Sequence, residues 1–437
     1  ARTMGFNPTT QFATGSQLTE PTITQVGPDR FAVAWVKTSS SGVGEIQGRV
    51  LTTDGGNVTS TSTLTGLPDE QPTEIDLLAE PAITQVGTDR VAVAWREEPP
   101  LTANQNPDVI SGKVFTSGGQ STGSFSDDNG FVNKEDPAIT ELGTDRFVVA
   151  WRDEDQAFIG PATDEIRGKV FTSQGQSTAS FAIDRGGDTK KEPAITELGT
   201  DRFAVVWQDS TSIRGDVFTT DGSGNITQTD TLGGALATAA SQESPQITQI
   251  GTDRFAVIWQ DSGQDIRGRL FSTDNNGNIT ATITLDPDLV TGDNQASPTI
   301  AEIDTDRFAV AWQDSGNLDI QGRVFTINGV STTASVTTST LENLATINDQ
   351  SDPLITQVGT DRLVVAWVKN GGIEGQVFQD QIAASSITRA SPSAATFTNS
   401  NGSSATFAVT FPEEVQNVSP DDFTLTGTAA SAGASLG

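Results

Sequence analysis

Seven copies of one unit make up most of this chain, and the tryptophans mark their register. Each unit opens with Pro-x-Ile-Thr (once Pro-Thr-Ile-Ala), passes through Asp-Arg and reaches Trp fourteen residues after the Pro. Successive units step by 60, 56, 56, 52, 53 and 55 residues. All seven Trp of the chain occupy this position: Trp35, Trp95, Trp151, Trp207, Trp259, Trp312 and Trp367. Such a period predicts stacked copies of one supersecondary unit.

Each unit has the pattern of four strands. The run FAVAW (31–35) places Phe, Val and Trp on one face and two Ala on the other. This alternation, rich in aromatic and β-branched residues, is typical of a strand. Three further strand-like runs are the Pro-x-Ile-Thr segment, IRGRLF (266–271) and NITATITL (278–285). The segments between these runs contain Gly, Asn and Asp, as hairpin turns require. We therefore expect each unit to be a four-stranded antiparallel meander, the size of a propeller blade.

The unequal faces of this sheet predict how the copies pack. The large Phe-Val-Trp face needs a partner, and the small Ala face of a neighbouring copy offers the space. Radial stacking satisfies every copy and leaves only short sheet edges, whereas an open solenoid would need capping repeats that the chain does not show. The sequence predicts an all-β fold, a seven-bladed β-propeller over residues 1–380.

The ends of the chain support a closed ring. The seventh unit stops at Phe378 without a fourth strand, whereas the segment before Pro21 resembles a fourth strand plus its connection. We expect residues near 5–13 to complete blade seven and so to close the ring.

Composition limits the partners of the chain. The formal net charge is −31 with only 25 Lys and Arg, which argues against a nucleic-acid partner and favours divalent cations over polyanions. Cys and His are absent. No apolar run has transmembrane length, so no direct membrane insertion is expected, and no signal peptide is recognisable at the N-terminus.

The amino-acid composition of the chain changes after Phe378. Residues 381–437 are rich in Ser, Ala and Thr, and we expect a linker followed by the start of an immunoglobulin-like β-sandwich. The tail resembles the first strands of bacterial immunoglobulin-like domains at Phe407, Val409, Phe411, Asp422, Phe423, Thr424 and Leu425. Because such a tail is about half a domain, we expect the natural chain to continue past Gly437.

The repeats themselves resemble those of large secreted or surface proteins of bacteria, cyanobacteria among them. The shared line, Phe-Val-Val-x-Trp followed by Ile-x-Gly-x-x-Phe, is closest at Phe147, Val148, Val149, Trp151, Ile166, Gly168 and Phe171. Val91 and Leu363 depart from it while remaining apolar. The resemblance implies adhesins, surface-layer or sheath components, or motility-related coats, in which propellers are joined to immunoglobulin-like and calcium-binding modules.

The repeated residues fit a scaffold better than a site. Asp-Arg recurs in all seven units, where Asp can cap a turn and Arg can pair with a neighbouring carboxylate. We expect the seven Trp to be structural core residues rather than sugar-stacking platforms. The Gly of each third strand is expected to make room for that indole.

Carboxylates in the loops after Trp are the candidate metal ligands. Calcium prefers oxygen ligands, and these loops combine Asp with Gly and Ser, although none matches an EF-hand. Solvated surface charge is the alternative. The candidate calcium ligands are Asp153, Asp155, Asp209, Asp261, Asp265, Asp314 and Asp319.

Two classes of function remain open. The first is a non-enzymatic extracellular or cell-surface module, with a glycan or protein ligand on the face of the long loops or with self-association in a surface assembly. The second is a propeller glycoside hydrolase or lyase using paired carboxylates, since without His or Tyr only Asp and Glu remain for acid–base work. Asp304 replaces the Gly of other units and is either a lone deviation of catalytic interest or a turn variant.

Overall fold

The structure is a computed structural model. It describes residues 2–15, 17–40, 42–54, 57–67, 77–98, 107–127, 132–154, 164–178, 180–184, 189–221, 224–233, 236, 241–290, 294–316, 318–328, 335–341, 344, 350–360, 362–382, 386–391 and 406–410. Contacts divide the chain into two compact units, one spanning Phe6–Gln379 and the other Ala1–Gly5 with Asp380–Gly437. Within the described ranges, no helix has the length and apolar character needed to cross a membrane.

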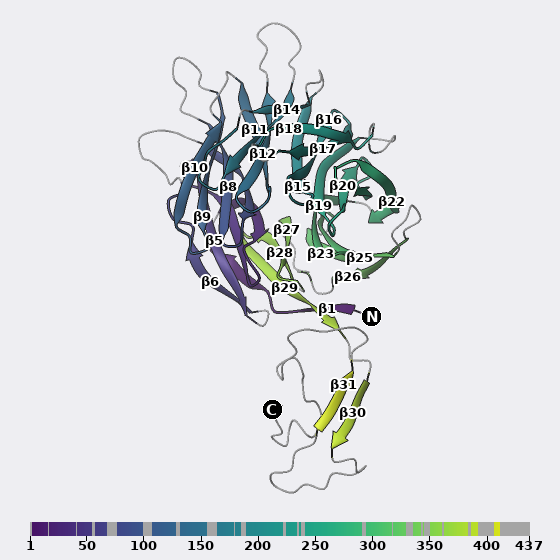
Figure 1. The fold of residues 1–437 in the computed structure, drawn as a ribbon. Helices are drawn as coiled ribbons and strands as arrows, with labels where there is room; N and C mark the ends of the chain where they lie inside the picture. Colours follow the sequence, from purple (N-terminus) through teal and green to yellow (C-terminus); the bar gives the residue numbers. More distant parts are fainter. Residues whose placement is uncertain are drawn as a thin grey trace. The chain divides into compact units, whose positions relative to one another are not determined.

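Seven antiparallel sheets confirm the predicted seven-bladed propeller (Figure 1). Their strands run in sequence order from the first strand of each blade outward. Blade one consists of β3 (Leu18–Gln25), β4 (Arg30–Thr38), β5 (Gly44–Asp54) and β6 (Asn57–Thr63). Blade two consists of β7 (Leu77–Val86), β8 (Arg90–Glu98), β9 (Val109–Thr116) and β10 (Ser121–Asp127). Blade three consists of β11 (Asn133–Glu141), β12 (Arg146–Glu154), β13 (Glu165–Thr172) and β14 (Phe181–Asp184).

The remaining blades repeat this order. Blade four consists of β15 (Lys190–Glu197), β16 (Arg202–Asp209), β17 (Ser212–Thr220) and β18 (Ile226–Thr231). Blade five consists of β19 (Gln242–Gln249), β20 (Arg254–Asp261), β21 (Ile266–Thr273) and β22 (Ile279–Val290). Blade six consists of β23 (Gln295–Asp304), β24 (Arg307–Asp314), β25 (Asp319–Asn328) and β26 (Ser335–Thr340). Blade seven is β27 (Gln350–Val358), β28 (Arg362–Lys369) and β29 (Gly372–Ile382), joined by β1 (Arg2–Phe6) and β2 (Thr10–Ala13). Each first strand contacts the first strands of both neighbouring blades, so that these seven strands form the inner ring.

The core lies between blades, as the unequal faces predict. Ala92 and Ala94 of blade two share one buried cluster with Phe147, Val149 and Trp151 of blade three. Equivalent clusters join blades one and two, three and four, four and five, and five and six, and a further cluster joins the large face of blade one with Ala366 of blade seven. All seven indoles are buried, with at most 3% of their surface exposed. Stacking large against small faces thus supplies the apolar burial that holds the ring together.

The glycine of each third strand has a different role from the one expected. A Cβ on Gly112 would overlap the ring of Phe125, a fourth-strand residue of the same blade. At Gly48 a Cβ would lie 2.7 Å from Leu64 Cδ1, and Leu64 comes directly after the fourth strand of its blade. The expectation that these glycines make room for the indole is therefore wrong, since the space is taken by the apolar side chain at the end of the fourth strand.

The N-terminus closes the ring, as expected. Thr10 and Gln11 of β2 pair with Gly375 and Glu374 of β29, and Asn7 N–H donates to Val377 O at 3.0 Å. Phe12 is 1% exposed and packs against Phe31, with ring centroids 5.2 Å apart. Blade seven is thus built from both ends of the propeller sequence.

The Asp-Arg turns join neighbouring blades. The Arg of one turn pairs with the Asp of the next, as in Arg90–Asp145 (3.2 Å) and Arg254–Asp306 (2.6 Å), and Arg362–Asp29 (2.7 Å) continues the series across the closure. Arg307 of blade six pairs with Asp304 at 2.7 Å, and Asp361 of the next turn lies outside the described residues. Asp304 is therefore part of the turn, in agreement with the turn variant.

The second compact unit includes one described hairpin. Strands β30 (Ser386–Ser391) and β31 (Thr406–Thr410) pair antiparallel, with Ile387 opposite Val409 and Arg389 opposite Phe407. The other five residues of the immunoglobulin-like motif lie outside the described residues, so that assignment stays a prediction.

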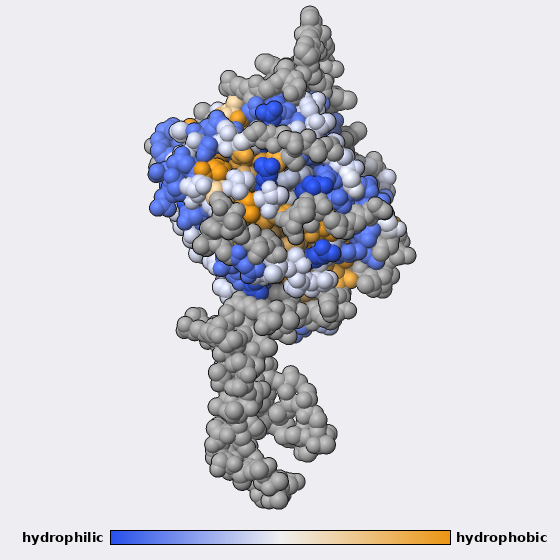
Figure 2. Space-filling view, turned by 90° about the vertical axis from the view of Figure 1, so that its right-hand side faces the viewer, coloured by the Kyte–Doolittle hydropathy of each residue, from blue (hydrophilic) through white to orange (hydrophobic). Residues whose placement is uncertain are grey.

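Figure 2 shows hydrophilic residues over much of one face of the molecule, with narrow apolar bands between them. Among the described residues, Leu318 is the exposed large apolar side chain, at 38%.

Candidate functional site

One position of the first strand has an unusual backbone in every blade. The residue directly before the Pro of each unit has a φ between 50° and 55° in all seven blades. In the sheet pairing this dipeptide forms a bulge, for example between Glu135 and Ala138. Non-glycine residues rarely occupy this left-handed region, and strained positions concentrate at functional sites. The seven residues are Glu20, Glu80, Asp136, Glu192, Ser244, Ser297 and Asp352.

Side chains at this position link one blade to the next. The Glu80 N–H donates to Glu20 Oε2 at 2.6 Å, and the Asp136 N–H donates to Glu80 Oε2 at 2.7 Å. The Glu192 N–H then donates to Asp136 Oδ2 at 3.2 Å, and the Ser244 N–H to Glu192 Oε2 at 2.9 Å. We call Glu20, Glu80, Asp136 and Glu192 the acidic arc, because their carboxylates run as a hydrogen-bonded series from blade one to blade five.

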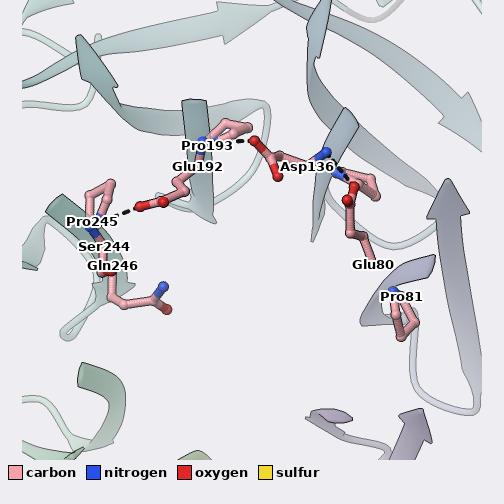
Figure 3. A pocket seen from close by; sticks show the side chains of 9 residues that line it. Glu80, Pro81, Asp136, Glu192, Pro193, Ser244, Pro245 and Gln246 are labelled. Carbon is pink, nitrogen blue, oxygen red and sulfur yellow. Dashed lines mark hydrogen bonds between the residues drawn. The ribbon is translucent and has the colours of Figure 1, made fainter. Parts of the chain in front are cut away.

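Three members of the acidic arc, Glu80, Asp136 and Glu192, border a pocket of about 280 Å³ on the inner ring. In Figure 3 the side chains of Glu80, Asp136 and Glu192 follow the wall of this pocket, and Gln246 extends into the open space beside them. The wall is completed by the residues Pro81, Pro137, Pro193, Ser244 and Pro245. The site therefore combines carboxylate oxygens with the flat apolar faces of proline rings.

Two arginines from second strands balance part of this charge. Arg96 Nε lies 3.2 Å from Glu80 Oε1, and Arg152 Nε lies 3.7 Å from Asp136 Oδ2. Burial raises the pKa of Glu80 above its ordinary value, and the nearby Arg96 guanidinium opposes that rise. Burial also raises the pKa of Asp136, opposed by the Glu192 N–H. These carboxylates are partly desolvated acceptors, which favour cations and N–H or O–H donors.

A second series of side chains links the blades at the other end of the first strands. The Gly27 N–H donates to Gln85 Oε1 at 3.1 Å, and the Gly87 N–H donates to Glu141 Oε1 at 2.6 Å. Burial raises the pKa of Glu141 to about 7, although the Gly87 N–H opposes it. Since Gln and Glu fill the same position, these residues act as connectors between blades.

Most candidate calcium ligands are held by the protein's own donors. Asp153 accepts the Trp151 indole N–H at 2.6 Å and lies 3.3 Å from Arg167 Nε. Asp209 pairs with Arg214. Basic side chains that pair with these carboxylates compete with a metal ion for the same oxygens.

Blade five follows the same pattern. Asp261 pairs with Arg267 and accepts the Gly263 N–H at 2.8 Å, and Asp265 lies 4.0 Å from the same guanidinium. The structure brings these two carboxylates together around one cation of the chain. Asp155 lies outside the described residues.

Asp314 and Asp319 differ from the others. They lie directly opposite each other at the end of the β24–β25 hairpin, and Gln321 occupies the register position where blade five has Arg267. Asp314 accepts the Gly316 N–H at 2.9 Å and the Gln321 amide at 3.0 Å. Asp319 Oδ1 is buried and makes no hydrogen bond with the residues that the structure describes. Over those residues, no group of three acidic side chains converges in a way that could hold a metal.

Sequence reasoning missed the acidic arc, although a signal for it exists. An acidic residue precedes the Pro in five units, as in LTEP, LAEP, KEDP, KKEP and QSDP. These acidic residues form a candidate site only in the folded ring, which brings positions 52–60 residues apart into contact. Parts of the predicted long loops at 65–80, 96–109 and 127–136, namely residues 68–76, 99–106 and 128–131, lie outside the described residues, so that binding face stays a prediction.

Comparisons with known proteins find solved structures of low similarity. No family model matches the chain, and no curated protein matches it. Similar solved structures include a protein of unknown function from Dyadobacter fermentans, with 12% identity over 70% of this chain and 95% of that one and a TM-score of 0.44. An α-L-arabinanase from Penicillium chrysogenum has 10% identity over 86% and 98% of the chains and a TM-score of 0.43. A fucose-specific lectin from Aleuria aurantia has 12% identity over 74% and 96% and a TM-score of 0.39. Such values carry no argument about the activity of this chain.

Proposed function

We propose that this chain is a non-enzymatic binding module of a large extracellular or cell-surface protein, and that the acidic arc contacts a cationic group of its ligand. The observation that supports this most is the placement of three successive carboxylates, Glu80, Asp136 and Glu192, around one pocket at a backbone position that favours glycine. Holding non-glycine residues there costs of order 1 kcal/mol each. We infer that the carboxylate side chains at this position have a function that glycine could not provide, because they occupy it despite that cost.

The charge of the arc favours a basic protein segment as ligand. Glu20 and Glu192 contribute carboxylates with no arginine partner among the described residues, although Lys191 Nζ lies 3.2 Å from Glu192 Oε1. A lysine or arginine side chain of a partner could replace such an exposed surface pair. The net charge of −31 would also steer a basic partner towards the molecule.

The test measures the binding of a hexalysine peptide by calorimetry at low salt and at physiological salt. Glu192→Gln keeps an acceptor for the Ser244 N–H but removes the charge, and we expect about tenfold weaker binding. Glu374→Gln is the matched control, because it removes one charge from a residue paired with Lys369 on blade seven. Equal affinity of the two variants would contradict the role of the arc, and no binding by the wild type would contradict the ligand class.

A calcium ion at the blade-six hairpin is part of the proposal. Like charges directly opposite each other destabilise an antiparallel pair, and Asp314 with Asp319 is the candidate pair without a basic partner among the described residues. A divalent cation would relieve that repulsion and accept carbonyl ligands as well.

Thermal unfolding with calcium and with excess chelator tests this site. We expect calcium to raise the midpoint of the wild type and to have no effect on Asp314→Asn/Asp319→Asn. The control Asp261→Asn, whose carboxylate is paired with Arg267, should keep the calcium response. A response that survives in the double variant would place the metal elsewhere, and no response in the wild type would remove calcium from the proposal.

Glycoside hydrolysis or elimination is the second candidate. Burial raises the pKa of two carboxylates of the same pocket, Glu80 and Asp136, and a raised pKa is what a general acid requires. Against this role, Glu80 Oε1 is paired with Arg96 and Oε2 accepts the Asp136 N–H. Release of reducing ends from a polysaccharide panel that Glu80→Gln abolishes would favour this candidate over the binding module.

A further inference from the structure

One buried position of the first strand differs in chemistry around the ring. It lies three residues before the Pro, where the first strand meets the preceding blade, and its side chain is at most 6% exposed in every blade. Two blades have leucine there, two have lysine and three have glutamine. The residues are Leu18, Leu78, Lys134, Lys190, Gln242, Gln295 and Gln350.

The leucines and glutamines make neutral contacts with the preceding blade. Leu78 lies in one apolar cluster with Ile46, Leu64 and Leu67 of blade one. Gln242 accepts the Ile213 N–H of blade four at 2.8 Å, and its counterpart in blade seven makes the equivalent bond. These interfaces bury no net charge at this position.

The interface between blades three and four is charged at the same position. Lys190 is 1% exposed, and its Nζ lies 3.4 Å from Asp184 Oδ2 of blade three and 3.4 Å from Asp209 Oδ1 of its own blade. The Lys190 N–H donates to Asp164 Oδ2 at 3.3 Å. Both nitrogen–carboxylate distances of the ammonium are long for a charge-assisted hydrogen bond.

The interface between blades two and three is also charged. Lys134 is 1% exposed, and its Nζ makes no hydrogen bond with the part of the chain that the structure describes. It stands opposite Asp153 in the β11–β12 register. Asp127 of blade two, 3% exposed, lies 3.0 Å from Lys169 Nζ of blade three.

We propose that the two interfaces flanking blade three (β11–β14) are the joints at which the ring opens first. Desolvation of a buried ion pair cancels much of its attraction, and apolar contacts of similar volume are often more stabilising. Blade three has a charged interface on both sides, so local opening should separate it from blades two and four before other blades part.

Amide hydrogen exchange of the full chain at neutral pH, resolved to single residues, tests this directly. The acidic arc supplies one reporter for each of the four interfaces from blade one to blade five, since each of its hydrogen bonds joins two blades. We expect the Asp136 and Glu192 N–H groups, which cross the charged interfaces, to exchange at least about tenfold faster than those of Glu80 and Ser244. Equal exchange, slower exchange, or first opening at the β2–β29 closure would overturn the proposal.

A variant that copies the neutral interface of blades one and two gives a second test. Lys190→Leu with Asp164→Gly reproduces Leu78 and Gly44, which occupy the equivalent register positions. Asp184→Ala removes the other blade-three carboxylate beside the lysine, and Asp209 keeps its pair with Arg214. We expect the Glu192 N–H to slow to the rate of the Glu80 N–H while the Asp136 N–H stays fast. Unchanged exchange at Glu192, or equal slowing at both, would contradict the proposal, and the wild-type comparison decides it if the variant does not fold.

Discussion

At the scale of the residue, Glu141 shows how a single buried proton affects this fold. Four other blades have Gln at the same connector position, whereas Glu141 has its pKa raised to about 7 by burial. The folded state therefore binds the proton more tightly than the unfolded chain, whose glutamate titrates near 4.5. The stabilisation that comes from this tighter proton binding is full below pH 4.5 and is lost as the pH rises through about 7.

Glu141→Gln should consequently stabilise the propeller at pH 8 and have little effect at pH 4.5. After allowance for solvent screening, we expect roughly 1 kcal/mol at pH 8, measured as a rise in the thermal midpoint. Gln85→Glu is the matched reverse change and should lower the midpoint at pH 8. A gain from Glu141→Gln that is equal at both pH values would rule out titration as the cause.

The third-strand glycine sets a second limit at this scale. A side chain at Gly112 would overlap the ring of Phe125, and that ring is held at 4.9 Å from Phe147 and 4.8 Å from Phe171. We expect Gly112→Ala to cost about 1–3 kcal/mol by overpacking. Denaturant unfolding checks this against Gly118→Ala, where the nearest atom is 3.6 Å away and little change is expected.

At the scale of the element, the first strand carries most of the chemistry that joins the blades. Its start bears the acidic arc, its buried position three residues before the Pro sets the charge of the interface, and its end bears the Gln or Glu connector. The second strand, by contrast, is a uniform apolar element whose alternation fixes the large and small faces. The first strand therefore carries much of the variation in the contacts between blades, while the apolar middle of the second strand stays constant.

At the scale of the whole molecule, the closure decides whether seven blades behave as one unit. Phe12 belongs to the N-terminal strand yet lies in the same buried cluster as Phe31, Ile373 and Val377. We expect Phe12→Ala to cost about 3–5 kcal/mol, as for a core aromatic, with a single cooperative transition lost or broadened. Calorimetric unfolding, with Thr10→Ala on the partly exposed part of β2 as control, checks this. A cost below about 1 kcal/mol would mean that the ring does not depend on the closing strand.

The sequence by itself determined the number of blades, the four strands of each, the closing N-terminal segment and the faces that meet between blades. These features follow from period-two alternation and from a fixed spacing of Pro and Trp, which are local properties of the chain. Only the tertiary structure decided which charges meet. Asp209 and Asp261, expected as calcium ligands, lie beside Arg214 and Arg267, and Glu80 and Asp136 became neighbours although 56 residues separate them. The pleat of a strand fixes the side of the sheet on which a carboxylate lies. The arginines beside Asp209 and Asp261 come from the next strand of the same blade, whereas the partner of Glu80 comes from the next blade and meets it only in the assembled ring.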